Sequence, residues 1–377
     1  MKYRKSVFLS LLVLALVSVY AQPIIYPIFT SKSLIAPTKS KQLLTKSTNT
    51  SYQPIAAEGF ARLIGEDLEK FETIYGKPVE KLTTGFSYDI QIYYANEQHG
   101  YMEVSTEAEK IVGIKLIGQQ KKSDQLFTFD MDMGQLTKLT TIYPNFTLSY
   151  ENQAIDIELN EEDMNYRPLV AFDNETFAIL FFDQVTSKVH SVMYLSKELL
   201  LKLAPYSMEG EVVPRFVKEK AVEWPVADNQ KELFTRNIFN MLRKKDHLPI
   251  YQHNLNLQLA TKQLLTQFLT NPSDSLTTQR VQLLQKIMAN QTREKFAMSS
   301  DESKTLLNKF SLSQSDLYVE LPIYDPSFTI LTWYSSSFLH TRFMEKKEEA
   351  LAIAFTKENM VVLLQAMQTT HKESDDK

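Results

Sequence analysis

The sequence predicts an α+β fold with two folded domains. Of its 377 residues, 44% are hydrophobic and 23% are charged, which is typical of a globular protein. Between residues 54 and 206, short helical patterns are followed by runs with the alternation of antiparallel strands. From residue 228 onward, the apolar spacing is mainly helical and ends in a strand-turn-strand pattern. Separate groups of helices and antiparallel strands are typical of an α+β protein.

The first 53 residues are expected to precede the folded domains. Three basic residues lead into an uncharged apolar run from Ser6 to Tyr20, and Ala21 ends a stretch suited to signal peptidase. Residues 1–29 therefore predict a signal peptide or, if it stays uncleaved, an N-terminal membrane anchor. Residues 30–53 are rich in Ser, Thr and Lys and predict a flexible linker. We expect an extracytoplasmic protein of a bacterial cell envelope, either secreted or anchored in the cell membrane by this segment.

Residues 54–206 are expected to form one domain from two repeated units, each a short amphipathic helix followed by three strands. Gly65 matches Gly134, Tyr75 matches Tyr143, and residues 88–90 match residues 155–157. The nearly constant spacing of these matches argues for an internal duplication. The apolar side of the first helix is expected at Leu68, Phe71, Ile74 and Tyr75. The expected strands are 86–95, 100–106 and 110–118 in the first unit, and 152–160, 176–184 and 188–196 in the second.

The rest of the chain predicts a linker and a second domain. Residues 207–227 mix charged residues with prolines and predict the linker, and residues 228–371 the domain. Asp228 or Asn229 is positioned to cap a helix that ends near Arg243. Further helices are expected at 253–269, 277–291 and 328–344. The closing segments 350–355 and 360–367 predict a β-hairpin, with Lys357, Glu358 and Asn359 at a turn without glycine.

The composition excludes several kinds of site. Nine glycines are present and the last is Gly210, so the second domain lacks the glycine-rich loops of P-loop and Rossmann sites. Without cysteine there is no disulfide or thiolate nucleophile, and the six histidines are too scattered to predict a metal site or a cofactor. The net charge is −4, and the first 52 residues contain basic but no acidic side chains. The folded part is therefore acidic, which disfavours nucleic-acid binding.

Two stretches resemble a known pair of bacterial domains. Residues 60–206 are similar to the CAP-associated N-terminal domain through IGEDLEKFETIYGKPVEK, KIVGIKLIG and DMNYRPLVAFDNETFAILFFDQVTSKVHSVMYLS. Residues 228–371 resemble the CAP domain of cysteine-rich secretory proteins, antigen 5 and plant pathogenesis-related proteins through FNMLRKKDHLPIYQHNLNLQLATKQLL and AIAFTKENMVVLLQAM. The resemblance implies that the second domain is a divergent CAP-like α-β-α sandwich. It implies that Asn240, Arg243 and Trp333 are framework residues.

The resemblance also indicates where a cleft would lie. CAP domains usually gather two histidines and two glutamates in one cleft, in some members around a divalent metal. One family histidine falls at Gln263 and another at Thr270 or Asn271, so these two are replaced. Only Glu294 and His340 keep the family's residue types, which makes them the candidate catalytic residues of a degenerate CAP domain. On residue type alone, Glu294 also fits a solvated helical glutamate, and His340 fits a histidine that packs within a helix.

Two classes of function follow from the sequence. The first is a non-catalytic envelope protein that binds or scaffolds a protein, peptide or lipid. The second is a hydrolase or metal-dependent enzyme with a remodelled cleft at Glu294 and His340, and a variant is lipid binding along the apolar helices 255–268 and 276–288. A further candidate is an aromatic ligand platform on adjacent strands, although packing is the commoner role of such rings. Its members are Tyr88, Tyr93, Tyr94 and Tyr101.

Overall fold

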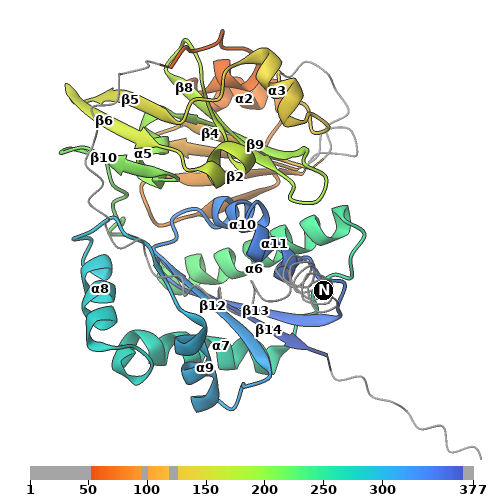
Figure 1. Ribbon diagram of the computed structural model, residues 1–377, viewed down its shortest axis with the longest axis vertical. Coiled ribbons are helices and arrows are strands. Elements are labelled where there is room, and N and C mark those ends of the chain that lie inside the picture. The colour runs from red at the N-terminus through yellow and green to blue at the C-terminus, as the bar shows by residue number, and fades with distance from the viewer. Residues whose placement is uncertain (1–51, 95–100, 119–125, 368–377) are drawn as a thin grey trace, which may run out of the picture.

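The computed structural model describes residues 52–94, 101–118 and 126–367. The expected signal or anchor segment 1–29 and nearly all of the linker 30–53 lie outside these residues. Figure 1 shows two domains stacked along the long axis, with the N-terminal domain above the C-terminal domain.

The N-terminal domain is built on a seven-stranded antiparallel sheet with the order β1-β2-β3-β4-β9-β8-β7. Every residue of β8 is buried, which explains why this strand has a continuous apolar run instead of an alternating one. The strands are β1 (Glu80–Thr83), β2 (Asp89–Tyr94), β3 (Tyr101–Glu107), β4 (Lys110–Ile117), β7 (Leu169–Ala171), β8 (Thr176–Phe182) and β9 (Val189–Ser196).

Different elements cover the two faces of this sheet. One face packs against η1 (Gly59–Leu63), α2 (Leu68–Tyr75) and α3 (Met133–Leu139). The other face packs against α5 (Lys197–Leu203), a small three-stranded sheet and the C-terminal domain. The small sheet has the order β10-β6-β5, with β5 (Asn145–Tyr150), β6 (Gln153–Glu158) and β10 (Ser207–Glu209), and α4 (Glu161–Tyr166) follows β6.

The large sheet has two similar halves. The meanders β2-β3-β4 and β7-β8-β9 meet where β4 pairs with β9, and α2 or α3 precedes each meander. Asp67, the N-cap of α2, forms an isolated antiparallel β-bridge through its backbone with Lys110. Asp132, the N-cap of α3, forms an equivalent β-bridge with Lys188. This arrangement supports a duplication, which stays a prediction.

The residues matched between the two expected repeat units do not occupy equivalent positions in the two halves of the domain. Gly65 precedes α2, whereas Gly134 lies within α3. Residues 88–90 lead into the large sheet, whereas residues 155–157 belong to β6 in the small sheet. The β5-β6 hairpin explains the mismatch. The sequence pattern of β6 is similar to that of β2, but β6 belongs to the small sheet and β2 to the large sheet. In α2, Leu68 and Phe71 are buried as expected, but Ile74 is 60% exposed because it lies on the outer side of the last turn.

The C-terminal domain is an α-β-α sandwich around a four-stranded antiparallel sheet with the order β11-β12-β14-β13. The strands are β11 (Phe296–Ala297), β12 (Ser315–Leu321), β13 (Glu349–Thr356) and β14 (Asn359–Ala366). One face packs against α7 (Leu255–Thr270), α8 (Thr278–Met288) and α9 (Ser300–Lys309), with the short η2 (Pro272–Asp274) between the first two helices. The other face packs against α6 (Trp224–Lys245), α10 (Pro326–Tyr334) and α11 (Ser337–Phe343).

Several expected boundaries were wrong in this half. α6 begins at Trp224 because Pro225 suits the first turn of a helix, so part of the expected linker is helical. Asp228 is not a cap: its carboxylate pairs with Lys231 at 2.8 Å and accepts from the backbone N of Lys357 at 3.1 Å. The run 328–344 forms two helices, and neither α9 nor β12 was expected. The closing hairpin is present, and Lys357 turns it with a φ of 58°.

Candidate functional site

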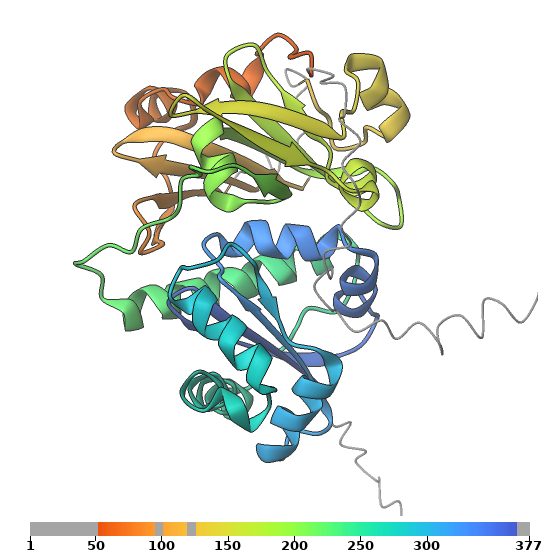
Figure 2. The same ribbon diagram turned by 60° about the vertical axis from the view of Figure 1, so that its left-hand side comes forward.

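α10 lies at the centre of the molecule, between the two domains (Figure 2). Eight of its nine residues are buried. Phe328 packs edge-on against Phe181 of β8, with ring centroids 5.9 Å apart, and belongs to the same core as Leu351 and Ile353 of β13. One continuous core thus joins the large sheet of the N-terminal domain to the sheet of the C-terminal domain. A helix that is apolar on all sides is expected where both sides are covered.

Buried charges fix the N-terminal end of α10. The N-cap Asp325 accepts from the backbone N of Phe328 at 2.9 Å, and Lys115 of β4 donates to its carboxylate at 2.5 Å. Lys115 also pairs with Glu103 of β3 at 2.8 Å, and Glu103 accepts from the Ser327 hydroxyl at 2.6 Å. Burial alone would lower the pKa of Lys115, but the two carboxylates outweigh it and raise that pKa. Buried charges are stable only when paired in this way, so the network fixes the register between the domains.

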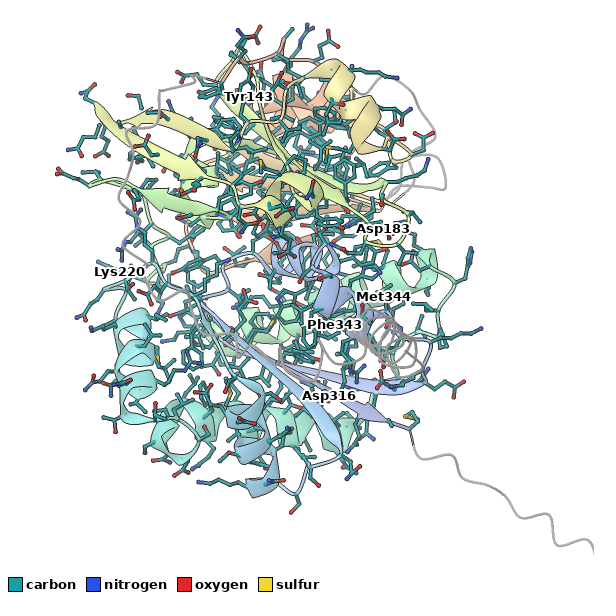
Figure 3. The ribbon with its side chains drawn as sticks, in the orientation of Figure 1. Tyr143, Asp183, Lys220, Asp316, Phe343 and Met344 are labelled. Atoms are coloured by element: carbon teal, nitrogen blue, oxygen red, sulfur yellow. The ribbon has the colours of Figure 1, made fainter. Side chains whose placement is uncertain are left out.

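The C-terminal end of α10 is held by different groups. The carbonyl of Ser335 accepts from Gln184 Nε2 at 2.5 Å and from Arg167 at 3.4 Å. The Tyr334 hydroxyl donates to Asp183 and contacts Asp246 Oδ2 at 2.7 Å. Asp183 lies at the domain boundary (Figure 3). Donors at a helix C-terminus satisfy its free carbonyls and complement its dipole.

Two histidines flank the ring of Tyr334, one from each domain. His190 of β9 and His340 of α11 lie edge-on to it, with ring centroids 4.2 and 4.6 Å away. His340 donates from Nδ1 to the carbonyl of Tyr334 at 2.8 Å. His190 contacts the Ser335 hydroxyl at 3.4 Å and the Ser191 hydroxyl at 2.8 Å, and burial holds its pKa well below the usual range.

A substrate cannot reach this cluster of Tyr334, Ser335, His190 and His340, because its side chains are buried. Ser335 is fully buried, and His190 is 1% exposed. The second ring nitrogen of His190 faces a hydroxyl and not a carboxylate, so a Ser-His-acid arrangement is not formed. The contacts of this cluster pack the two domains against each other and fix their relative position.

The structure does not bring Glu294 and His340 together. Glu294 is exposed in the loop before β11, and its backbone N donates to Thr292 Oγ1 at 3.2 Å. Phe296, two residues later, pairs with Leu321 at one end of β12. Arg342, two residues after His340, binds Asp316 at the other end of β12, at 2.8 Å. The alternative interpretation of Glu294 was a solvated glutamate in a helix. Glu294 is solvent-exposed, but it lies in a loop.

The other positions of the expected cleft are also dispersed. Gln263 and Thr270 are exposed on α7, and Asn271 is exposed just after it. α7 packs on the face of the sheet opposite to α10 and α11. The residues carried over from the resemblance therefore do not line one described cleft.

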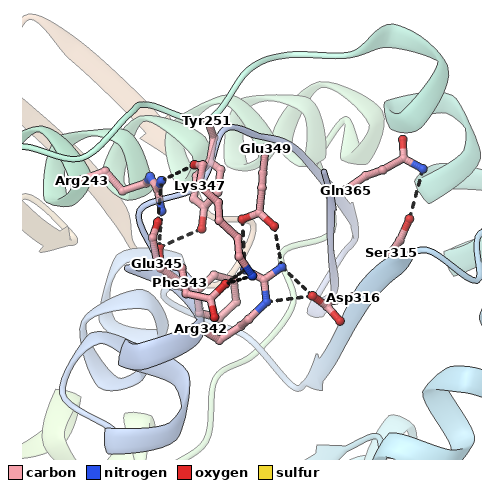
Figure 4. Close-up of polar contacts among 10 residues, drawn as sticks. All are labelled: Arg243, Tyr251, Ser315, Asp316, Arg342, Phe343, Glu345, Lys347, Glu349 and Gln365. Atoms are coloured by element: carbon pink, nitrogen blue, oxygen red, sulfur yellow. Dashed lines mark hydrogen bonds and ion pairs between the residues drawn. The ribbon is translucent and has the colours of Figure 1, made fainter. Parts of the chain in front are cut away.

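The framework residues have defined structural contacts. Arg243 is fully buried and donates to the carbonyls of Phe343 at 2.7 Å, Lys347 at 2.9 Å and Glu345 at 3.0 Å (Figure 4). It also donates to the carbonyl of Pro249 at 2.5 Å. Asn240 Oδ1 accepts from the backbone N of Tyr251 at 2.8 Å. Trp333 donates from its indole to Glu320 at 2.6 Å and stacks on Phe343. These contacts hold the segments 249–251 and 343–347 against α6.

The candidate tyrosines do not form one platform. The Tyr88 and Tyr101 side chains lie in the core between the domains, whereas Tyr93 lies in the core under α2. The Tyr88 hydroxyl donates to the carbonyl of Tyr324 at 2.7 Å and so bridges the domains. The side chain of Tyr94 lies outside the described structure. The opposite facing of Tyr88 and Tyr93 follows from the two-residue period of a strand.

A cleft of about 670 Å³, including its open mouth, lies where the two domains and their connection meet. Its walls come from α5, the segment 214–216, the loop 290–295 and the segment 322–329. No local sequence pattern indicates this cleft, because it combines residues 201–216 with the loop 290–295 and the segment 322–329, which are distant in the chain. The sequence contains one indication of the domain interface: Lys115 places a charge within the apolar strand 110–118.

Two features are absent from residues 52–94, 101–118 and 126–367. No helix there combines the length and the apolar character needed to cross a membrane. No three or more His, Asp or Glu side chains of the described residues gather closely enough to hold a metal ion.

Comparison with known proteins gives a family match for the N-terminal domain and a similar fold for most of the chain. Residues 64–206 match the family model described as CAP-associated N-terminal. The chain is 22% identical over 193 residues to the Bacillus subtilis protein named "Uncharacterized membrane protein YlbC"; the match covers 50% of this chain and 54% of that protein. The chain thus spans about half the length of the curated relative it matches.

Two solved structures are similar over most of the chain. One is a cysteine-rich secretory protein from Staphylococcus aureus, with a TM-score of 0.62 and 18% identity, covering 84% of this chain and 95% of that one. The other is an extracellular protein containing a SCP domain from Bacillus anthracis, with a TM-score of 0.62 and 14% identity, covering 85% and 99%. At these identities the likeness establishes the fold alone, and it extends over both domains. Residues 64–206 therefore match the CAP-associated N-terminal family, and the chain as a whole has an α+β fold similar to that of two solved SCP-domain proteins.

Proposed function

We propose that this protein is a non-catalytic, extracytoplasmic binding or scaffolding protein. The observation that carries the proposal is the dispersal of the expected cleft: Glu294 is exposed in a loop while His340 is buried and donates to a backbone carbonyl. The face of the C-terminal domain that carries α10 is occupied by the N-terminal domain. A general base and its acidic partner need hydrogen-bond or one-water reach, and this pair lacks it.

The location is part of the same proposal. The apolar segment 1–29 has the pattern of an export signal or anchor. The names of the similar proteins include a membrane protein and an extracellular protein, which supports a position outside the cytoplasm. We infer that the segment exports the two domains and either is cleaved near Ala21 or anchors them.

Calorimetric titration with Zn²⁺, Mn²⁺ and Mg²⁺ tests the proposal. We expect no saturable binding in the micromolar range, because Glu294 and His340 cannot ligate one ion together. Glu294→Gln and His340→Gln are compared with Glu348→Gln, which changes an exposed glutamate elsewhere in the same domain. Micromolar affinity that the first two variants abolish and the third retains would sink the proposal.

The apolar helices give little support to the lipid-binding variant. Leu264, Leu265 and Phe268 of α7 and Leu284 and Ile287 of α8 are buried in the core against the sheet. Leu255 and Leu259 are exposed, but two leucines on the outer side of one helix do not make a groove. Burial of these side chains therefore favours a plain hydrophobic core over a lipid groove between the two helices.

A further inference from the structure

The cleft between the domains has an unusual set of charged walls. It is lined by four cationic side chains, Lys202, Arg215, Arg293 and Lys295, and by one carboxylate, Asp325. The connection between the domains supplies Arg215, and the loop after α8 supplies Arg293 and Lys295. The cleft therefore brings positive charge together from three segments of an otherwise acidic chain.

Two of these five charged side chains have ion-pair partners. Asp325 is paired with Lys115 at 2.5 Å. Lys202 is paired with Glu107 at 2.9 Å and with Glu198 at 2.8 Å. Among the described residues, no carboxylate lies within ion-pair distance of Arg215, Arg293 or Lys295. Three cationic side chains of this cleft thus have no ion-pair partner among the described residues.

The two arginines are held in place by uncharged acceptors. Arg215 donates from one terminal nitrogen to the carbonyl and side-chain oxygens of Asn290, the latter at 2.9 Å. Arg293 donates from one terminal nitrogen to the carbonyl of Val213 at 3.1 Å. Each guanidinium has five N–H donors in a fixed plane, so several remain for a ligand. Both arginines line the same cleft, and partial burial together with the charge of Arg215 lowers the pKa of Arg293.

We propose that this cleft binds a phosphate-bearing ligand through Arg215, Arg293 and Lys295. Two planar guanidinium groups match the oxygens of a phosphate, and three positive charges suit a dianion better than a single carboxylate. The ligand would relieve the repulsion between the two arginines and join the connecting segment to the loop 290–295. This site rests on the proposed binding function and names the chemistry of its ligand.

Titration of the full chain with inorganic phosphate, followed by calorimetry, tests the site. We expect saturable binding that Arg215→Gln and Arg293→Gln each weaken about tenfold, since each removes a charge-assisted pair. Lys295→Gln is expected to weaken it about threefold. Its matched control is Lys304→Gln, because Lys304 is also exposed and lies on α9, outside the cleft. Arg293→Lys keeps the charge but loses the planar fork, so its affinity should lie between wild type and Arg293→Gln.

Sedimentation of the full chain with phosphatidylglycerol or phosphatidylcholine vesicles distinguishes the source of the phosphate. Retention on phosphatidylglycerol that falls in the Arg215→Gln and Arg293→Gln variants and is competed by phosphate indicates a lipid headgroup. Phosphate binding without this dependence indicates a soluble ligand. The site is overturned if neither probe depends on the two arginines, or if Lys304→Gln weakens binding as much as Lys295→Gln. Failure here leaves the non-catalytic proposal intact, because that proposal depends on the metal titration.

Discussion

Arg243 shows how one buried charge can hold several loops of this protein. Its guanidinium is fully buried and donates to four backbone carbonyls from two segments. No carboxylate bonds to it among the described residues, so its charge is solvated by peptide dipoles that would otherwise lack donors. Arginine suits this position because it keeps its charge and offers five donors in one plane.

We expect Arg243→Gln to lower the free energy of unfolding by about 3 kcal/mol, because several buried carbonyls lose their donor. Urea unfolding measures the change. Arg62→Gln is the matched control, because exposed Arg62 donates to a single carbonyl, that of Ala57, at 2.7 Å. The control should lose less than about 1 kcal/mol. Equal losses in the two variants would contradict the framework role.

At the scale of the element, α10 is positioned by its ends as much as by its apolar sides. Asp325, Glu103 and Lys115 fix the first turn, while Gln184, Arg167 and Asp183 of the N-terminal domain hold the last turn. Apolar contacts alone would let a short helix slide along the sheet, because they are not directional. Polar contacts at both ends specify one register.

Asp183 should make the free energy of unfolding fall more steeply at acid pH. Burial alone would raise its pKa, but hydrogen bonds from Tyr334 and Thr186 outweigh this and lower the pKa to about 2. Because the folded pKa lies below the unfolded one, the stabilisation is complete above about pH 4 and is lost as the pH falls through about 2. We expect Asp183→Asn to cost about 2 kcal/mol at neutral pH and to lose less stability than wild type between pH 4 and 2.

Denaturant unfolding across that pH range measures the effect. Asp316→Asn is the control, because Asp316 is more than half exposed although it also forms a close ion pair, with Arg342. A pH profile for Asp183→Asn that runs parallel to that of wild type would show that the carboxylate does not act in this way.

At the scale of the whole molecule, the two domains share one hydrophobic core through α10. Separate cores also exist on the outer side of each sheet, one containing Phe71 and the other Leu265. The molecule therefore has three packed layers of side chains, of which the middle one belongs to both domains. Domains that share a core are expected to unfold together.

Scanning calorimetry should show a single transition for the described domains. Phe71→Ala and Leu265→Ala create cavities in the two outer cores, and each should cost about 3 kcal/mol. We expect both variants to lower the midpoint of the same transition. Two transitions, each lowered by only one of the variants, would show that the domains unfold independently.

The sequence predicted much of the fold but little of the site. Strands such as β3, β8 and β9 and the closing hairpin were identifiable because their apolar patterns are local. The contact of Lys115 with Asp325 joins residues 210 apart and depends on how two domains dock, which no local pattern encodes. Glu294 and His340 kept the residue types of a family cleft, yet residue type does not determine where the loop before β11 directs a side chain. No sequence feature distinguishes Arg215, Arg293 and Lys295, because single cations on connecting segments are common.

The glycine-free turns of the C-terminal domain also affect the unfolded chain. Four residues there, His247, Asn290, Ser311 and Lys357, adopt a positive φ that glycine would adopt without strain. Each costs some backbone strain in the folded state. In return, an unfolded chain without glycine samples fewer backbone conformations, so this domain gives up less conformational entropy when it folds. The same turns that strain the native backbone therefore narrow the ensemble from which the domain must fold.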